Sequence, residues 1–379
     1  MDLVVGAARV DQRRPVRHLD PVLLLTTVLL TVVGFLLVYS ATRPSLETFH
    51  QDPGFYLKKQ VAFAALGVAL MLLVATFDYR FYKVYAGFAY TAAVFALAVV
   101  QTPIGSSSAG AQRWFEFAGF QITPSEFTKV ALILMLANVL SELRTPQPPL
   151  SGVIRISILA GVPTFLVFIQ PDIGTTIVLV AILGGMLVVA GTRPRHVIAL
   201  SVTGVLLIYG AFQLHVIKDY QLERVKAFLD QQSSPGDLRY NLDQSLIAIG
   251  SGGITGQGYL HGRLTNLNFV PEQHTDFIFT AAGEEFGFAG SATILVLFAC
   301  LLWRAIRIAY LSKDPFGTLV ASGVATMLAI QMFVNIGMTV GIMPITGIPL
   351  PFVSYGGSAM LTNYIAVGLL LNVHMRRFN

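Results

Sequence analysis

The sequence carries little charge and almost no cysteine. Charged residues make up 12% of its 379 positions and hydrophobic residues 54%, whereas soluble domains are typically about 25% charged. A water-soluble globular fold is therefore excluded. The single cysteine, Cys300, lies inside an apolar run, which also excludes disulfides and cysteine-based metal sites.

Several signatures of soluble enzymes are missing too. The sequence has no P-loop, no dinucleotide-binding glycine fingerprint, no His-Glu-x-x-His motif and no Gly-x-Ser-x-Gly elbow. Its net charge of +5 comes from basic residues scattered at the ends of apolar runs rather than clustered on one face. Nucleic acid is therefore not an expected partner.

The sequence contains instead a series of long apolar runs. Each has roughly the 20 residues that a helix needs to cross a hydrocarbon core. They predict an all-α polytopic membrane protein of about ten transmembrane helices, with the whole chain, 1–379, forming one membrane domain. The expected spans lie near 21–41, 60–77, 84–101, 124–143, 152–169, 173–190, 195–213, 285–307, 316–340 and 353–374.

Basic residues give the expected orientation. With the N-terminus inside, the inner segments hold fifteen lysines and arginines, whereas the short outer loops hold four, Arg43, Lys58, Lys59 and Arg113. The positive-inside rule favours this orientation, with both termini cytoplasmic and an even number of spans. The long segment 214–284, between the seventh and eighth helices, is then extracytoplasmic. Within it, apolar residues at helical spacing over 218–229 predict an interfacial helix.

Glu126 and Lys129 open the fourth expected span. They stand three residues apart, so they share a helix face and can form an ion pair. Two structural interpretations compete with a functional one. Thr123, Pro124 and Glu126 fit a helix capping box, and the long Lys129 side chain can snorkel toward the membrane surface.

Asp276 lies where the long outer loop re-enters the membrane. It suits a helix cap if a helix begins at Phe277, and it suits a general base at a wet, outward-facing boundary. Glu284 and Glu285 follow, and a structural role is expected for both. In the loop after the third span, Arg113 beside Trp114 fits either an interfacial anchor or a fork that grips phosphate oxygens.

These segments belong to an ordered set of motifs between about residues 110 and 370. The set comprises Gly110-Ala111-Gln112-Arg113-Trp114, Pro124-Ser125-Glu126 with Lys129, Gln170-Pro171-Asp172-Ile173-Gly174-Thr175, Arg224-Val225 with Phe228-Leu229-Asp230, Gln244-Ser245-Leu246-Ile247-Ala248 with Gly252-Gly253, Pro271-Glu272 with His274-Thr275-Asp276-Phe277-Ile278-Phe279, Glu284-Glu285-Phe286-Gly287, Asn335-Ile336-Gly337-Met338, and Gly347-Ile348-Pro349-Leu350-Pro351-Phe352 with Ser354-Tyr355-Gly356-Gly357-Ser358. By these motifs the chain resembles the SEDS (shape, elongation, division and sporulation) proteins. It resembles their RodA branch more closely than their FtsW branch.

The resemblance implies a peptidoglycan glycosyltransferase of the bacterial cytoplasmic (inner) membrane. Such an enzyme polymerises lipid II during cell-wall elongation, releases undecaprenyl pyrophosphate and works with a class B penicillin-binding protein, the transpeptidase. A lipid II flippase, a division-type polymerase and a scaffold without chemistry of its own are the alternatives.

The resemblance also implies roles for particular residues. Asp276 matches the family's essential acidic residue, and Glu126 and Lys129 match its functional polar pair. No certain cofactor is implied; a divalent cation, Mg or Mn, is left open, with no metal ligands identified. The residues expected to bind substrate are Arg113, Arg224, Gln112, Trp114, Gln244, Ser245, Asn335, Ser354 and Tyr355.

Overall fold

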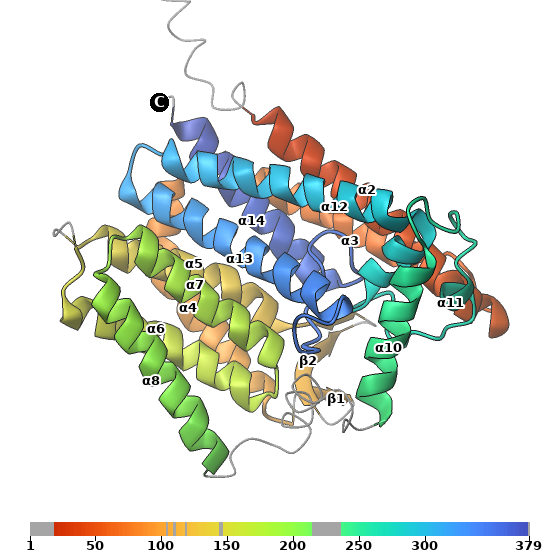
Figure 1. Cartoon of the computed structure of the whole chain (residues 1–379). Helices are drawn as coiled ribbons and strands as arrows, with labels where there is room; N and C mark the ends of the chain where they lie inside the picture. Colours follow the sequence, from red (N-terminus) through yellow and green to blue (C-terminus); the bar gives the residue numbers. More distant parts are fainter. Residues whose placement is uncertain are drawn as a thin grey trace, which may run out of the picture.

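The computed structural model describes residues 19–103, 105–108, 111–117, 120–143, 147–213 and 236–377. They form a bundle of long helices (Figure 1). Ten long helices coincide with the ten expected spans: α2 (Pro21–Thr48), α3 (Phe55–Thr76), α4 (Tyr79–Val100), α5 (Pro124–Ser141), α6 (Leu150–Ile169), α7 (Ile173–Val189), α8 (Pro194–Gln213), α12 (Ile278–Tyr310), α13 (Pro315–Thr339) and α14 (Gly357–Arg376). The predicted all-α membrane architecture is confirmed.

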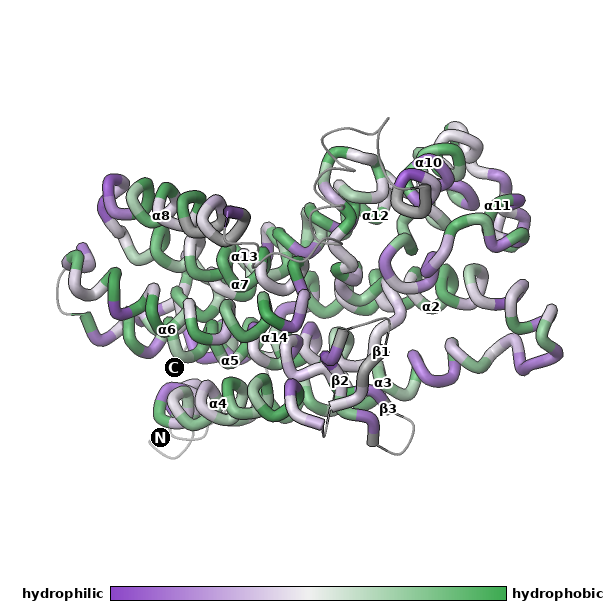
Figure 2. The backbone as a smooth tube through the Cα atoms, turned by 90° about the horizontal axis from the view of Figure 1, so that it is seen from below, coloured by the Kyte–Doolittle hydropathy of each residue, from purple (hydrophilic) through white to green (hydrophobic). Residues whose placement is uncertain are grey.

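Eight of these helices are long and apolar enough to cross a membrane, and α7 is also apolar but has 17 residues. They differ in how much of their apolar surface faces the protein. Inside α5, α13 and α14, 72%, 67% and 89% of the apolar window is buried, against 17% in α4. Helices α5, α13 and α14 therefore form the centre of the bundle. Figure 2 shows hydrophobic residues along the helices and hydrophilic ones mainly at helix ends and connections.

Local sequence explains where several helices begin. Asp20 precedes Pro21 and accepts hydrogen bonds from the first free N–H groups of α2, both at 3.1 Å. Asp314 precedes Pro315 and caps α13 in the same way, through Gly317 N–H at 2.9 Å. An acceptor at the N-cap followed by proline is a favoured way to start a helix.

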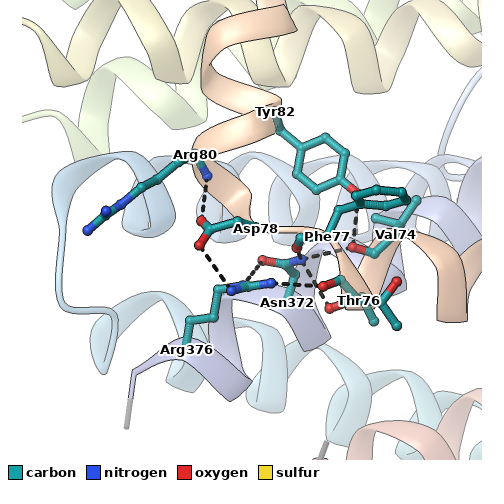
Figure 3. Close-up of polar contacts among 9 residues, drawn as sticks. Val74, Thr76, Phe77, Asp78, Arg80, Tyr82, Asn372 and Arg376 are labelled. Atoms are coloured by element: carbon teal, nitrogen blue, oxygen red, sulfur yellow. Dashed lines mark hydrogen bonds and ion pairs between the residues drawn. The ribbon is translucent and has the colours of Figure 1, made fainter. Parts of the chain in front are cut away.

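The two ends of the described chain lie at one end of the bundle, here called the termini end. Arg304 of α12 pairs with Asp20, and His374 Nδ1 of α14 lies 3.8 Å from the same carboxylate. Figure 3 shows the neighbouring contacts, in which Arg376 of α14 pairs with Asp78, just before α4, at 3.1 Å. Asn372 donates to the backbone carbonyls that end α3.

The connections at the opposite end, here called the loop end, contain structure that the apolar pattern did not predict. The segment after α4 forms an antiparallel sheet in the order β1 (Ser106–Ser108), β2 (Ala111–Phe117) and β3 (Phe120–Ile122). The long segment after α8 contains α10 (Gly236–Ser251) and the short α11 (Arg263–Asn266). The predicted interfacial helix at 218–229 lies outside the described residues.

Helix α12 starts at residue 278, well before the expected 285, because Glu284 and Glu285 interrupt the apolar pattern but not the helix. It bends at Gly287, whose φ of 65° is in the left-handed region. There the backbone of the preceding loop approaches closely: Phe288 N–H donates to Gly253 O at 2.9 Å, and Ala289 N–H to Ile254 O at 3.0 Å.

Candidate active site

The segment between α13 and α14, residues 340–356, runs through the loop end without regular structure. At its centre Gly347 has a φ of 75°, a conformation that side chains other than glycine rarely adopt. A Cβ placed on Gly347 would lie 3.1 Å from Asp276 Oδ2. The carboxylate of Asp276 therefore lies directly against this turn.

Asp276 occupies a tight turn just before α12. The N–H groups of residues 275, 276 and 277 all donate to Glu272 O, at 3.2, 3.1 and 3.4 Å. The N-cap of α12 is Phe277, and no side chain caps this helix end. The helix-cap interpretation of Asp276 is therefore wrong, and its half-buried carboxylate faces Gly347 instead.

The backbone on both sides of this contact is fixed by Asn335 of α13. Its Nδ2 donates to Asp276 O at 2.8 Å and to Ile348 O at 2.7 Å. One fully buried amide thus ties the turn that carries Asp276 to the residue after Gly347. Asn335, expected to bind substrate, has a direct positioning role in this arrangement.

Glu126 and Lys129 form the expected ion pair, with Lys129 Nζ 2.7 Å from Glu126 Oε2 and the side chains 1% and 9% exposed for Lys129 and Glu126. Lys129 does not snorkel, because its ammonium is buried in this pair. The capping-box interpretation is also wrong, because Thr123 N–H donates to Ser358 Oγ of α14 at 3.0 Å rather than to Glu126. The partner of the Thr123 N–H group therefore comes from a distant helix and not from the local capping motif.

The start of α7 links the ion pair to the Asp276 turn. Asp172 caps α7 through Thr175 N–H at 3.0 Å, and Ser125 Oγ, next to Glu126, donates to the same carboxylate at 3.5 Å. Gly174 packs against Thr346 O and Ile348, on either side of Gly347. Asp276 and the Glu126–Lys129 pair therefore lie on either side of the start of α7 and the Gly347 turn, at the loop end.

Arg113 and Gln112 are engaged with backbone groups. Arg113 Nε donates to Gln170 O at 2.8 Å and its Nη2 donates to Pro171 O, so the guanidinium holds the turn between α6 and α7. Gln112 Nε2 donates to Thr102 O at 2.6 Å and to Gly105 O at 2.8 Å. Arg113 therefore braces the turn before α7, and Gln112 braces the connection between α4 and β1.

Ser245 and Ser354 fix the ends of the α13–α14 segment. Ser245 of α10 donates to Thr339 O at 2.6 Å, and Ser354 Oγ accepts from Leu350 N–H at 2.9 Å. Gln244 and Trp114 are half-buried on α10 and β2. Arg224 lies outside the described residues.

Tyr355 belongs to an aromatic cluster beside Asp276. Its N–H donates to His274 O at 2.9 Å, and its ring centroid lies 5.0 Å from that of Tyr56 and 5.8 Å from that of His274. Burial lowers the pKa of His274 below its usual 6.5, although Glu272 opposes this shift. At neutral pH the cluster is therefore uncharged.

Sequence reasoning missed Tyr56 and Gln60 as parts of this end of the bundle. Gln60 is buried in α3, with its Nε2 3.4 Å from Val353 O and from Ser354 O. A polar residue in a transmembrane run is a functional signal, so Gln60 could have been found. The contacts of Tyr56 could not, because they depend on how α3 packs against a distant segment.

Glu284 has the structural role expected of it. Its buried carboxylate accepts from Leu264 N–H at 2.7 Å, Thr265 N–H at 3.0 Å and Thr265 Oγ1 at 2.7 Å, which holds α11 against α12. Glu285 accepts from Ser40 Oγ of α2.

No three His, Cys, Asp or Glu side chains in the described part of the chain are placed to hold a metal ion. The residues described do not by themselves fit a protein-built metal site.

Comparison with known proteins identifies relatives along nearly the full chain. A family model described as "Cell cycle protein", which covers FtsW, RodA and SpoVE, matches residues 21–379. The chain is 37% identical over 367 residues to a probable peptidoglycan glycosyltransferase FtsW of Geobacter sulfurreducens, covering 96% of this chain and 97% of the relative. It is 37% identical over 360 residues to the peptidoglycan glycosyltransferase MrdB of Escherichia coli, covering 95% and 94%. The FtsW relative and the MrdB relative are both 37% identical to this chain. The closer likeness to the RodA branch therefore stays a prediction.

Solved structures share the fold. One from a peptidoglycan synthase complex that coordinates polymerization and crosslinking superposes with a TM-score of 0.81 at 29% identity, covering 95% of this chain and 98% of the other. The rod shape determining protein RodA of Thermus thermophilus superposes with a TM-score of 0.69 at 28% identity, with the same coverage.

Proposed function

This chain belongs to the FtsW, RodA and SpoVE family of cell cycle proteins and is a peptidoglycan glycosyltransferase, and we propose that Asp276 and the Glu126–Lys129 pair carry its reaction. The substrate is lipid II, used both as donor and as acceptor. The observation that carries this proposal is the placement of Asp276, whose carboxylate leaves the α12 N-terminus uncapped and faces the Gly347 turn.

Asp276 acts as general base in this proposal. It takes the proton from the 4-hydroxyl of the acceptor's N-acetylglucosamine while that oxygen attacks C1 of the donor's N-acetylmuramic acid. The bond from C1 to the pyrophosphate oxygen breaks, and undecaprenyl pyrophosphate leaves. The turn that closes on Glu272 O and the amide of Asn335 hold the base in one geometry, which is what proton transfer requires.

The leaving pyrophosphate develops negative charge, which cations stabilise in a water-poor site. Lys129 is our candidate at the centre of the bundle, with Glu126 fixing its position. Arg113 and Arg224 remain candidates; Arg113 uses Nε and Nη2 on two backbone carbonyls, and its guanidinium has further N–H donors for phosphate. We propose that Gln112, Trp114, Gln244, Ser245, Asn335, Ser354 and Tyr355 shape the surrounding site.

We propose that the loop end faces outward and that both termini are cytoplasmic. The excess of basic residues in the segments at the termini end supports this orientation. The polymer would then be made on the side where the cell wall is assembled. A class B penicillin-binding protein is the partner we propose, because the chain superposes on a component of a synthase complex that couples polymerization to crosslinking.

Polymerisation by the purified protein tests the proposed function. In detergent there is no membrane to cross, so a polymerase makes glycan strands from lipid II, whereas a flippase or a passive scaffold makes none. The assay is run with and without the transpeptidase partner and with and without chelator. Absence of polymer under all four conditions would rule out the polymerase function.

A further inference from the structure

Two polar side chains deep in the bundle have no hydrogen-bond partner among the described residues. They are Gln331 of α13, at both Nε2 and Oε1, and Thr362 of α14, at Oγ1. Both residues are fully buried. A buried polar group left unpaired costs about 1–3 kcal/mol, so each such group in a native protein needs a physical explanation.

Thr362 differs from three other buried threonines of the bundle's helices. Thr27, Thr31 and Thr128 each donate to the carbonyl four residues earlier in their own helix, at 2.8 to 2.9 Å. Thr362 has no such bond. Its hydroxyl is therefore available to a group outside its own helix.

Gln331 lies at the depth of the Glu126–Lys129 pair. Gly323 of α13 packs against Ile133 of α5, since a Cβ on Gly323 would lie 2.8 Å from Ile133 Cγ2. The two helices run in opposite directions, so each residue further along α13 corresponds to one residue earlier in α5. Gln331, eight residues after Gly323, is therefore level with Ser125, beside Glu126.

Thr362 lies at the same depth. Thr123 N–H donates to Ser358 Oγ at 3.0 Å, so α5 and α14 begin level with each other and run in the same direction. Thr362, four residues after Ser358, is then level with Phe127, between Glu126 and Lys129.

The direction of each side chain follows from the helix period of about 100° per residue. On α13, Gly323 faces α5, and Gly317 faces Val373 of α14. Seen down the helix axis, the directions of these two glycines differ by about 120°. The Gln331 side chain points between these two directions, about 80° from that of Gly323. Glu126 and Lys129 lie on the face of α5 that Ile133 turns toward α13.

Thr362 points into the same space. Around α14, Ser358 faces α5 and Val373 faces α13. Thr362 lies between these directions, about 20° from Val373 and about 40° from Ser358. The two unpaired side chains and the ion pair thus converge where α5, α13 and α14 meet.

We propose that Glu126, Lys129, Gln331 and Thr362 enclose a binding site for ordered water. Water matches these groups chemically: it can accept from two of the three donors, the Lys129 ammonium, the Gln331 amide and the Thr362 hydroxyl, and it can donate to Glu126 and to Gln331 Oε1. A buried water typically makes about three such bonds.

This water supplies the hydrogen bonds that the ion pair needs inside the bundle. A buried ion pair is stable only when further hydrogen bonds satisfy its remaining donors and acceptors. Gln331 and Thr362 are thus positioning residues that act through water. The inference goes beyond the proposed function, because it concerns the hydration of the pair and not glycosyl transfer.

Infrared spectroscopy tests for the water without an activity assay. Each protein is measured in ordinary and in heavy-oxygen water, so that the difference spectrum isolates the bands of ordered water. In the wild type we expect a water band that shifts in heavy-oxygen water and that changes in Glu126→Gln. In Gln331→Met that band is lost. No such band in the wild type, or an unchanged band in Gln331→Met, would overturn the proposal.

Asn363 provides the matched control. It is buried, lies next to Thr362 in α14 and has an unpaired Oδ1, but it points about 100° away from Thr362. Asn363→Leu is expected to keep the water band. If Gln331→Met does not fold, Thr362→Val is nearly identical in shape to the wild type and is expected to lose the water band. Retention of that band in Thr362→Val would contradict the proposal just as directly.

Discussion

Asn335 donates from one amide nitrogen to the carbonyls of Asp276 and Ile348, at 2.8 and 2.7 Å, and so joins the turn before α12 to the segment that connects α13 and α14. The two carbonyls belong to segments that are separated by the whole of α12 and α13. The position of the proposed base therefore depends on a residue in the middle of the fold.

Replacing Asn335 with Leu is expected to misplace Asp276. Loss of the two bonds leaves two acceptors unpaired, at about 1–3 kcal/mol each, and a shift of about 1 Å in a reacting group costs roughly 100-fold in rate. Polymerisation of lipid II should fall by about that factor while the purified protein still folds. Asn138→Leu, at the termini end of α5, serves as control. Equal rates for the two variants would contradict the positioning role of Asn335.

Lys129→Met should abolish polymerisation and also destabilise the protein. Removing one member of a buried ion pair leaves an uncompensated charge and costs about 3–5 kcal/mol. Adding Glu126→Gln should restore most of the melting temperature but none of the activity. Activity near that of the wild type in Lys129→Met would show that the pair is only structural.

Gly347→Ala places a methyl group 3.1 Å from Asp276 Oδ2 in a backbone conformation that alanine adopts poorly. We expect a stability loss of about 1 kcal/mol and a fall in kcat larger than any change in KM, because the methyl group displaces the base and not the bulk of the substrate. Gly253→Ala is the control. Gly253 also has a positive φ, but a Cβ there would meet no neighbouring atom, so this variant introduces only the backbone strain. A similar fall in kcat in both variants would refute the specific contact.

The pH dependence of stability should contain a contribution from His274. Burial lowers its pKa in the folded protein below the ordinary 6.5. Below about pH 6.5 the unfolded chain therefore binds a proton that the folded protein does not, and stability falls as the pH decreases. In His274→Phe this part of the fall in melting temperature should disappear. The exposed His50→Phe should retain it, and an unchanged profile in His274→Phe would refute the assignment.

The apolar runs were sufficient to predict the ten helices, because the length of a membrane span is fixed by the bilayer. The start of α12 was predicted too late, since two glutamates looked like a loop although Glu284 is satisfied by α11. The cap interpretations weighed for Glu126 and Asp276, beside their functional ones, were wrong for a related reason. Capping motifs assume that a polar group finds a partner nearby in sequence, whereas Thr123 finds Ser358 across the bundle.

In the proposed reaction Asp276 removes the proton from the acceptor hydroxyl. The most direct test is polymerisation of lipid II in detergent by purified Asp276→Asn, which keeps the shape of the side chain and removes the base. Asp52→Asn, an acid exposed near the start of α3, is the control and should polymerise at the wild-type rate. No glycan polymer is expected from Asp276→Asn; strands of normal length made at the wild-type rate would contradict the role of Asp276 as the base.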